Sequence, residues 1–297
     1  SSGREGICSH ALARRCGYGR LWGSNGRNQR LDGMTPAPEI RANDLVRERQ
    51  VIQQKLRETL EFDELRAKRL ERQLIIERDR PRASDIIRAG MWHELAYLSA
   101  FAGRTEQALS RLDETQRIGF DDLGIILSRA FILEMGGRLT EARDVIEMLD
   151  AANIIEPSRK FLVPHYMELG MFKSATEIVT DIEEYDPYAL VAKAILEEHG
   201  VDDLEVTKRL EFAASMVIQR VGHPLVDYKL FAMRGEGILY QIVAKGSIEE
   251  LGKLGVELSD ALVDNFDGVL NEILCIDVIP FVPGNQSRQM EVFRVSV

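Results

Sequence analysis

The sequence predicts an all-α protein made of antiparallel helix pairs that stack into a solenoid. Its composition favours helix, because Ala, Leu, Glu and Arg are abundant and only 9 of 297 residues are Pro. Apolar residues recur mostly at helical spacing along the chain. A glycine followed five residues later by an alanine also occurs three times, at intervals of 34 and 33 residues.

Residues 1–33 differ in composition from the rest of the chain. They contain seven of the 23 glycines, six arginines, Cys8 and Cys16, but only two acidic residues. We interpret them as a vector-derived or disordered segment, with Met34 as a natural start. The alternative is a native basic arm that binds nucleic acid.

Residues 34–81 are expected to form a charged helical extension. Asn43 is a candidate N-cap, and apolar residues continue at helical spacing from Leu45 to Ile75. The seam is not a strict heptad, which favours a helical hairpin that bends near Phe62 over a long coiled coil. Pro81 should end this region, and Ser84 with Asp85 should start the next helix.

Residues 82–188 contain the repeats. The glycine–alanine pairs are Gly103 with Ala108, Gly137 with Ala142, and Gly170 with Ala175. Each glycine should end a first helix in a backbone conformation that is costly for other residues. Each alanine should let the second helix approach the first closely. A lone helix pair cannot bury its apolar face, so neighbouring pairs must stack.

These residues resemble the tetratricopeptide repeat family over about residues 88–188. The first repeat matches best, through Trp92, Leu95, Ala96, Gly103, Ala108 and Leu112. The second repeat keeps Ala130, Leu133, Gly137, Ala142 and Ile146, and the third keeps Leu162, Tyr166, Gly170, Ala175, Val179 and Pro187. Two departures are Arg129, where the family has a Leu-like residue, and Pro164, which should kink a first helix.

The resemblance implies a concave groove that is lined by the first helices and receives a partner. The matching positions are His93, Tyr97, Phe101, Leu127, Phe131, Glu134, Met135, Lys160, Pro164, Met167 and Glu168. This largely apolar lining suits an amphipathic helix or an extended hydrophobic segment of another protein. Alternatively, the groove is filled by the protein's own residues 43–80 or by its C-terminal helices.

Residues 189–272 are expected to form divergent helical pairs. One helix should cover residues 188–199, closed by Gly200, and another residues 202–220. A second pair should begin at Pro224, with interruptions at Gly235 and Gly237. Ser247 and Glu250 form a capping box for a helix over residues 248–264.

Residues 273–297 suggest a strand–turn–strand unit. Residues 274–282 and 290–297 are rich in Ile, Val and Phe, and Pro-Gly-Asn separates them. A lone hairpin is marginally stable in water. It must therefore pack on the helices, or pair with another chain and make a homo-oligomer.

Charge and cysteine content bear on function. Residues 34–88 carry 13 basic and 11 acidic side chains, whereas residues 89–297 carry 19 and 35. The acidic body disfavours nucleic acid and favours a basic partner. Outside residues 1–33 only Cys275 remains, which argues against disulfides and a cysteine metal site. Because no apolar run is long enough to span a membrane, we expect a cytoplasmic protein without membrane contact.

No catalytic constellation is evident in the sequence. The five histidines are dispersed, and His93 lacks the second histidine of a zinc-protease helix. The acidic cluster at residues 181–184 looks like a solvated helix end. We therefore expect no enzyme, metal or cofactor, but a protein-binding adaptor or chaperone, similar to the much shorter secretion chaperones of this repeat class. The alternatives are a regulator that contacts nucleic acid through residues 41–88, including Arg66, Lys68, Arg69 and Arg72, and an unrecognised enzyme.

Overall fold

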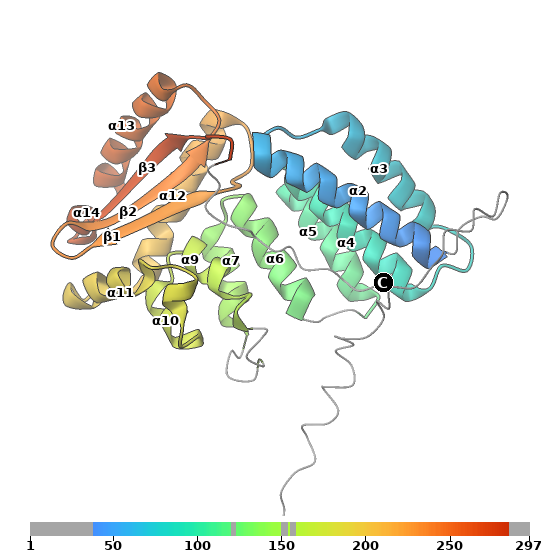
Figure 1. Cartoon of the computed structure of the whole chain (residues 1–297), viewed down its shortest axis with the longest axis horizontal. Coiled ribbons are helices and arrows are strands. Elements are labelled where there is room, and N and C mark those ends of the chain that lie inside the picture. Colours follow the sequence, from blue (N-terminus) through green and yellow to red (C-terminus); the bar gives the residue numbers. More distant parts are fainter. Residues whose placement is uncertain (1–37, 120–122, 150–153, 155–158, 285–297) are drawn as a thin grey trace, which may run out of the picture. The chain divides into compact units, whose positions relative to one another are not determined.

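The computed structural model describes residues 38–119, 123–149, 154 and 159–284. Within this part the chain is mainly helical, with a small three-stranded sheet that follows most of the helices (Figure 1). The all-α prediction is therefore correct for most elements but misses the sheet. The expectations for residues 1–33 and for a strand over residues 290–297 lie outside the described residues.

The first two helices form the predicted hairpin. Helix α2 spans Pro38–Thr59 and helix α3 spans Glu64–Arg78, so the break falls at Phe62 as expected. Asn43 is not the N-cap, because α2 already begins at Pro38. The carboxylate of Asp63 caps α3 by accepting a hydrogen bond from the backbone N–H of Arg66 at 3.1 Å.

Three helix pairs follow, and each glycine of the sequence repeat separates the two helices of a pair. The pairs are α4 (Asp85–Phe101) with α5 (Thr105–Arg117), α6 (Leu123–Met135) with α7 (Leu139–Glu147), and α9 (Val163–Glu168) with α10 (Phe172–Ile178). Gly103, Gly137 and Gly170 have φ values of 70°, 72° and 71°, the left-handed conformation predicted for them. Ser84 caps α4 as predicted.

Successive pairs pack against one another through the first helix of the later pair. Helix α4 contacts α6, and α6 contacts α9, while α5 also packs on α6. The alanines Ala108, Ala142 and Ala175 are fully buried, which permits close approach within each pair. Pro164 does not kink a helix, because it lies in the first turn of α9, where the missing N–H has no intrahelical partner to lose.

A longer helix, α12, runs along the glycine turns of these pairs. Short elements η2 (Ile182–Glu184) and α11 (Ala189–Glu198) precede α12 (Asp203–Val221), close to the ranges expected for the two helices. Gly170 faces Val206 and Leu210, and Gly137 faces Ala214 and Ile218, which lie eight residues further along α12. Eight helical residues rise about 12 Å, which is of the same order as the roughly 8–10 Å between the axes of packed helices. Pro224, which follows α12 in the chain, lies opposite Gly103 in the turn between α4 and α5.

Two carboxylates of α12 that bond the helix pairs are also eight residues apart. Asp203 accepts hydrogen bonds from the backbone N–H groups of Lys173 and Ser174 at 3.2 and 3.1 Å, at the start of α10. Glu211 accepts one from the N–H of Thr140 at the start of α7. Both carboxylates satisfy donors that a helix start leaves without an intrahelical partner. Thr207, between them, donates to the carbonyl oxygen of Leu169 at 2.7 Å.

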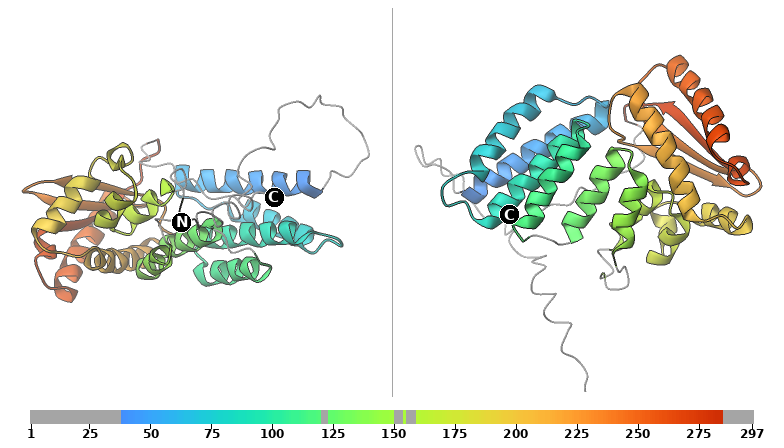
Figure 2. Two further views of the ribbon diagram at one scale, coloured as in Figure 1. Left: turned by 90° about the horizontal axis from the view of Figure 1, so that it is seen from below. Right: turned by 180° about the vertical axis from the view of Figure 1, so that it is seen from behind.

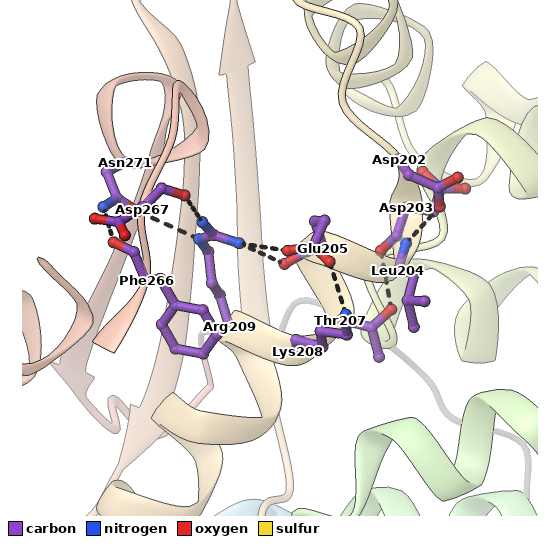
Figure 3. Close-up of polar contacts among 10 residues, drawn as sticks. All are labelled: Asp202, Asp203, Leu204, Glu205, Thr207, Lys208, Arg209, Phe266, Asp267 and Asn271. Carbon is purple, nitrogen blue, oxygen red and sulfur yellow. Dashed lines mark hydrogen bonds and ion pairs between the residues drawn. The ribbon is translucent and has the colours of Figure 1, made fainter. Parts of the chain in front are cut away.

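The N-terminal half of α12 is also tied to the C-terminal elements. Arg209 is buried, and its guanidinium donates to the carbonyl oxygen of Asp267 at 2.8 Å and to the side-chain oxygen of Asn271 at 3.3 Å (Figure 3). The same group bonds Glu205 and lies 4.7 Å from the centroid of the Phe266 ring. Helix α12 thereby joins the helix pairs to the elements that surround the sheet.

The sheet replaces the helical pair that was expected to begin at Pro224. Strands β1 (Tyr228–Met233) and β2 (Gly237–Ala244) form an antiparallel hairpin, in which Gly235 and Gly237 with φ of 81° and 113° make the turn. Buried and exposed residues alternate in β1. This two-residue period is that of a strand, so the helical interpretation was wrong.

The strand expected over residues 274–282 is present as the third strand, whereas its expected partner, residues 290–297, lies outside the described residues. The capping box of Ser247 and Glu250 starts α13 (Ile248–Asn265), and the short helix α14 (Leu270–Ile273) leads into β3 (Leu274–Pro280). Strand β3 pairs parallel with β2, and α13 provides the crossover that parallel strands require. Helices α12 and α13 cover one face of the sheet (Figure 2). The strand therefore packs within the chain, which is the first of the two options stated above.

The repeat glycines allow a direct test of how α12 supports the helix pairs. In Gly170→Ala the added methyl would lie 2.5 Å from the Val206 side chain and strain a φ of 71°. We expect a loss of about 2–4 kcal/mol in the free energy of unfolding, from overpacking and left-handed strain together. Gly200→Ala is the matched control, since its φ is 65° and nothing lies within 4 Å of the added methyl. It should lose only about 1 kcal/mol in urea unfolding, and equal losses would contradict the role of α12.

Candidate interaction surface

The side chains expected to line an open groove are mostly buried by the protein itself. All but Lys160 lie in α4, α6 or α9, and nine of them are at most 7% exposed. These nine are His93, Tyr97, Phe101, Leu127, Phe131, Glu134, Met135, Met167 and Glu168. Pro164 is half-buried, and Lys160 is exposed with its ammonium 5.7 Å from the centroid of the Tyr185 ring.

Helix α2 covers the part of this surface formed by α4. Its Arg49 is 1% exposed and donates from Nε to the carboxylate of Glu94 at 2.6 Å. The guanidinium also bonds Gln53 and lies 5.2 Å from the centroid of the Tyr97 ring. Ile52 and Leu56 of α2 belong to the same apolar cluster as Tyr97 and Phe101. A residue of the N-terminal extension thus neutralises a buried carboxylate on the first repeat.

A second cluster of polar side chains links α4 to α6. Ser128 donates to the carbonyl oxygen of Gly124 at 2.7 Å, which leaves its oxygen to accept from the Tyr97 hydroxyl at 2.7 Å and from His93 Nε2 at 2.8 Å. Burial and the nearby Arg49 lower the pKa of His93 to about 3, so its ring is neutral at pH 7. Burial raises the pKa of Tyr97.

The C-terminal part of the chain covers the surface formed by α6 and α9. The N–H of Leu225 donates to the carbonyl oxygen of Met135 at 3.0 Å, and the Tyr240 hydroxyl donates to that of Glu168 at 3.0 Å. Between α9, α12 and the sheet, a cavity of only about 10 Å³ remains. Below that cover, Glu134 and His165 Nδ1 are 2.7 Å apart and connect α6 to α9.

The predicted groove is therefore self-filled, as the alternative reading allowed. Residues 43–80 fill the first section through α2, and the strands and their lead-in fill the second, where C-terminal helices had been expected. The physical reason is that an apolar surface of this extent is costly in water, so the chain buries it. A partner of the folded protein must use another surface.

One exposed surface on α3 combines apolar and basic side chains. Leu65 and Ile76 are 72% and 60% exposed, and Arg69 and Arg72 lie between them, also exposed. Their spacing of four, three and four residues puts all four on one helix face, which we call the α3 face. Leu65 falls within the apolar spacing expected from Leu45 to Ile75, but it is on the solvent side of α3. The buried residues Ala67, Leu70 and Leu74 lie on a different side of the helix, and this difference in position could have been found from the sequence.

No described residue neutralises the charge of the α3 face. Among the described residues, Arg69 and Arg72 have no ion-pair partner. The acidic residues of α3 lie on other faces, where Glu71 pairs with Arg111 and Glu77 with Arg41 and Arg80. By contrast, Arg66 pairs with Glu48 and Lys68 with Glu64, so two of the four basic residues singled out for nucleic acid are already engaged.

A pocket of about 260 Å³ opens beside this helix, between α3 and the end of α4. Apolar side chains and both signs of charge line it: Phe62, Glu64, Ala67, Lys68, Glu71, Leu98, Ala102 and Arg104. Its mixed lining does not define a ligand by itself. It places a recess suited to a partner's side chain next to an exposed helix.

Comparisons with known proteins return no family model, no curated protein and no solved structure that matches this chain. In the part of the chain that the structure describes, no group of three or more His, Cys, Asp or Glu side chains is arranged to hold a metal ion. None of the described helices has the length and apolar character needed to cross a membrane.

The buried Arg49–Glu94 pair can be tested for its role in holding α2 on α4. In Arg49→Leu the Glu94 carboxylate stays buried without its partner, and we expect a loss of about 3–5 kcal/mol in the free energy of unfolding. The double variant Arg49→Leu/Glu94→Leu should regain most of this. Arg47→Leu on the same helix is the control, since its pair with Asp44 is exposed and should change stability by less than about 1 kcal/mol. A small loss in Arg49→Leu in chemical denaturation would contradict the proposed support.

The neutral state of His93 has a consequence for acid stability. Its folded-state pKa of about 3 is below the ordinary 6.5, so between these values the unfolded chain binds a proton that the folded chain does not. Stability should therefore fall as the pH drops from about 6.5, by at most about 1.4 kcal/mol per pH unit from this group. His93→Gln should lack this component, which unfolding curves at pH 4.5 to 7.5 would measure. Identical pH dependence in both proteins would refute it.

Proposed function

We propose that this chain is a protein-binding scaffold of the tetratricopeptide-like helical-repeat kind, whose partner docks on the α3 face. The repeat period of 33–34 residues and the packing of α4 on α6 and of α6 on α9 support the repeat part of the proposal. We also propose that the three pairs continue one another as a solenoid, and the same observations support this.

The observation that carries the docking part is the α3 face itself. Two arginines that have no ion-pair partner among the described residues lie between two large exposed apolar residues, on a chain with a formal net charge of −10. Exposed apolar side chains combined with arginine are typical of protein interfaces. The adjoining pocket offers a recess beside that face for one anchoring side chain.

The chemistry of the face also defines the partner. Arg69 and Arg72 favour a segment with carboxylates, and Leu65 and Ile76 favour apolar residues at matching helical spacing. An acidic amphipathic helix satisfies both requirements. Nucleic acid fits less well, because phosphate contacts do not use exposed leucine and isoleucine, and only two unpaired cations are present on the face. We infer a binding role and not a catalytic one.

The test is capture of partners from native-host extract by the wild-type chain and by Arg69→Glu/Arg72→Glu. We expect at least a tenfold lower recovery of a specific protein with this variant, because two attractive charges become repulsive. The control is Arg234→Glu/Lys253→Glu, which makes the same change in net charge at exposed residues outside α3. The captured protein is then purified, and its direct binding to the three chains is measured by calorimetry.

Two outcomes would contradict this function. If both variants lose the partner equally, net charge and not the α3 face carries binding. If the wild-type chain shifts labelled DNA or RNA at about 150 mM salt and Arg69→Glu/Arg72→Glu does not, the face binds nucleic acid.

A further inference from the structure

A second exposed apolar stripe lies on α13, at the other end of the described sequence. Ile248, Val256 and Val263 are 78%, 64% and 61% exposed, and their spacing of eight and seven residues places them on one side of the helix. The opposite side of α13 is buried through Leu251, Leu254, Leu258 and Leu262. Helix α13 thus has an apolar stripe toward the sheet and a second one toward solvent.

Acidic residues border this outer stripe. Asp260 and Asp264 are exposed and lie beside Val256 and Val263, four residues apart. Among the residues that the structure describes, neither has an ion-pair partner, whereas Glu249 pairs with Lys253 and Glu257 with Arg220. We call the stripe with these two aspartates the α13 face.

The α3 and α13 faces carry opposite charges, and both place charged side chains beside exposed apolar ones. Each combines exposed aliphatic side chains with two unpaired charges within about one helical turn, positive on α3 and negative on α13. The apolar residues span about 16 Å on α3 and about 22 Å on α13, so one face can lie along the other. Helix α3 packs on α2 and α4, and α13 packs on α12 and β3. Their exposed fractions show that neither face is covered by the residues that the structure describes.

We propose that the α3 face of one molecule docks on the α13 face of a second copy of this chain. This inference rests on the proposed function and names the acidic amphipathic partner helix as α13. Arg69 and Arg72 then pair with Asp260 and Asp264, while Leu65 and Ile76 contact the valines and Ile248. Because the two faces differ, the contact is heterologous. It closes into a ring or a reciprocal dimer, or it continues as an open chain.

The interface has few anchors, so the assembly is expected to be weak and sensitive to salt. Isolated exposed ion pairs contribute little, but four charges that approach together beside desolvated aliphatic side chains contribute more. Association should therefore depend on protein concentration and decrease when ionic strength screens the charges.

Sedimentation velocity of the full chain at 50 and 500 mM salt, over a range of concentrations, measures this directly. The wild-type chain should associate at 50 mM salt and dissociate at 500 mM. Arg69→Glu/Arg72→Glu and Asp260→Arg/Asp264→Arg should each weaken self-association at least tenfold. The quadruple variant combines both changes and keeps the wild-type net charge, so it should associate again through exchanged charges. An equimolar mixture of the two double variants should also associate.

The proposal is overturned if the wild-type chain stays monomeric at 50 mM salt, or if the quadruple variant does not regain association. Circular dichroism and thermal unfolding of each variant establish that it is folded, which the exposure of all four charged residues favours. The outcome also separates the two proposals. If Asp260→Arg/Asp264→Arg leaves capture of another protein intact while Arg69→Glu/Arg72→Glu abolishes it, the α3 face binds a different partner, and only the self-association inference fails.

Discussion

The structure depends on covering one apolar surface. The first helices of the three pairs carry many aromatic and aliphatic side chains. Leaving these side chains in water would cost tens of cal/mol per Å² of apolar surface, and in the folded chain they are buried. Helix α2 covers the surface near α4, and the strands with their lead-in cover it near α6 and α9. Helices α2 and α3 thus share one apolar cluster with α4, α5 and part of α6, and the sheet with α12 and α13 shares a second cluster with α6, α7, α9 and α10.

Helix α12 supplies the second constraint, which is geometric. Residues eight apart along α12 meet turns 33 residues apart in the repeats, and eight helical residues rise about 12 Å. The same step recurs in Asp203 and Glu211, which complete the hydrogen bonding of two helix starts. One regular helix thereby fixes the spacing between pairs whose own helices are short, such as α9 and α10.

Because the surface formed by α4, α6 and α9 is covered, a partner of the folded protein must bind elsewhere. With the first helices of the pairs covered, exposed surfaces remain for binding, and α3 and α13 each expose aliphatic residues beside charges that have no ion-pair partner among the described residues. Buried polar groups such as Arg49, His93 and Glu134 then serve to fix α2, α4, α6 and α9 against one another. Their burial explains why a set of residues that resembles a binding site in sequence is structural in the folded chain.

The sequence by itself determined the local structure. The glycines with positive φ, the buried alanines, the cap at Ser84 and the box at Ser247 follow from short-range backbone chemistry and are legible in a few residues. Only the tertiary structure decided that α4, α6 and α9 are buried over most of their surface, that residues 228–233 and 237–244 are strands, and that β3 pairs with β2. These outcomes depend on contacts between residues far apart in the chain, and a short segment carries no information about which distant surface will bury it.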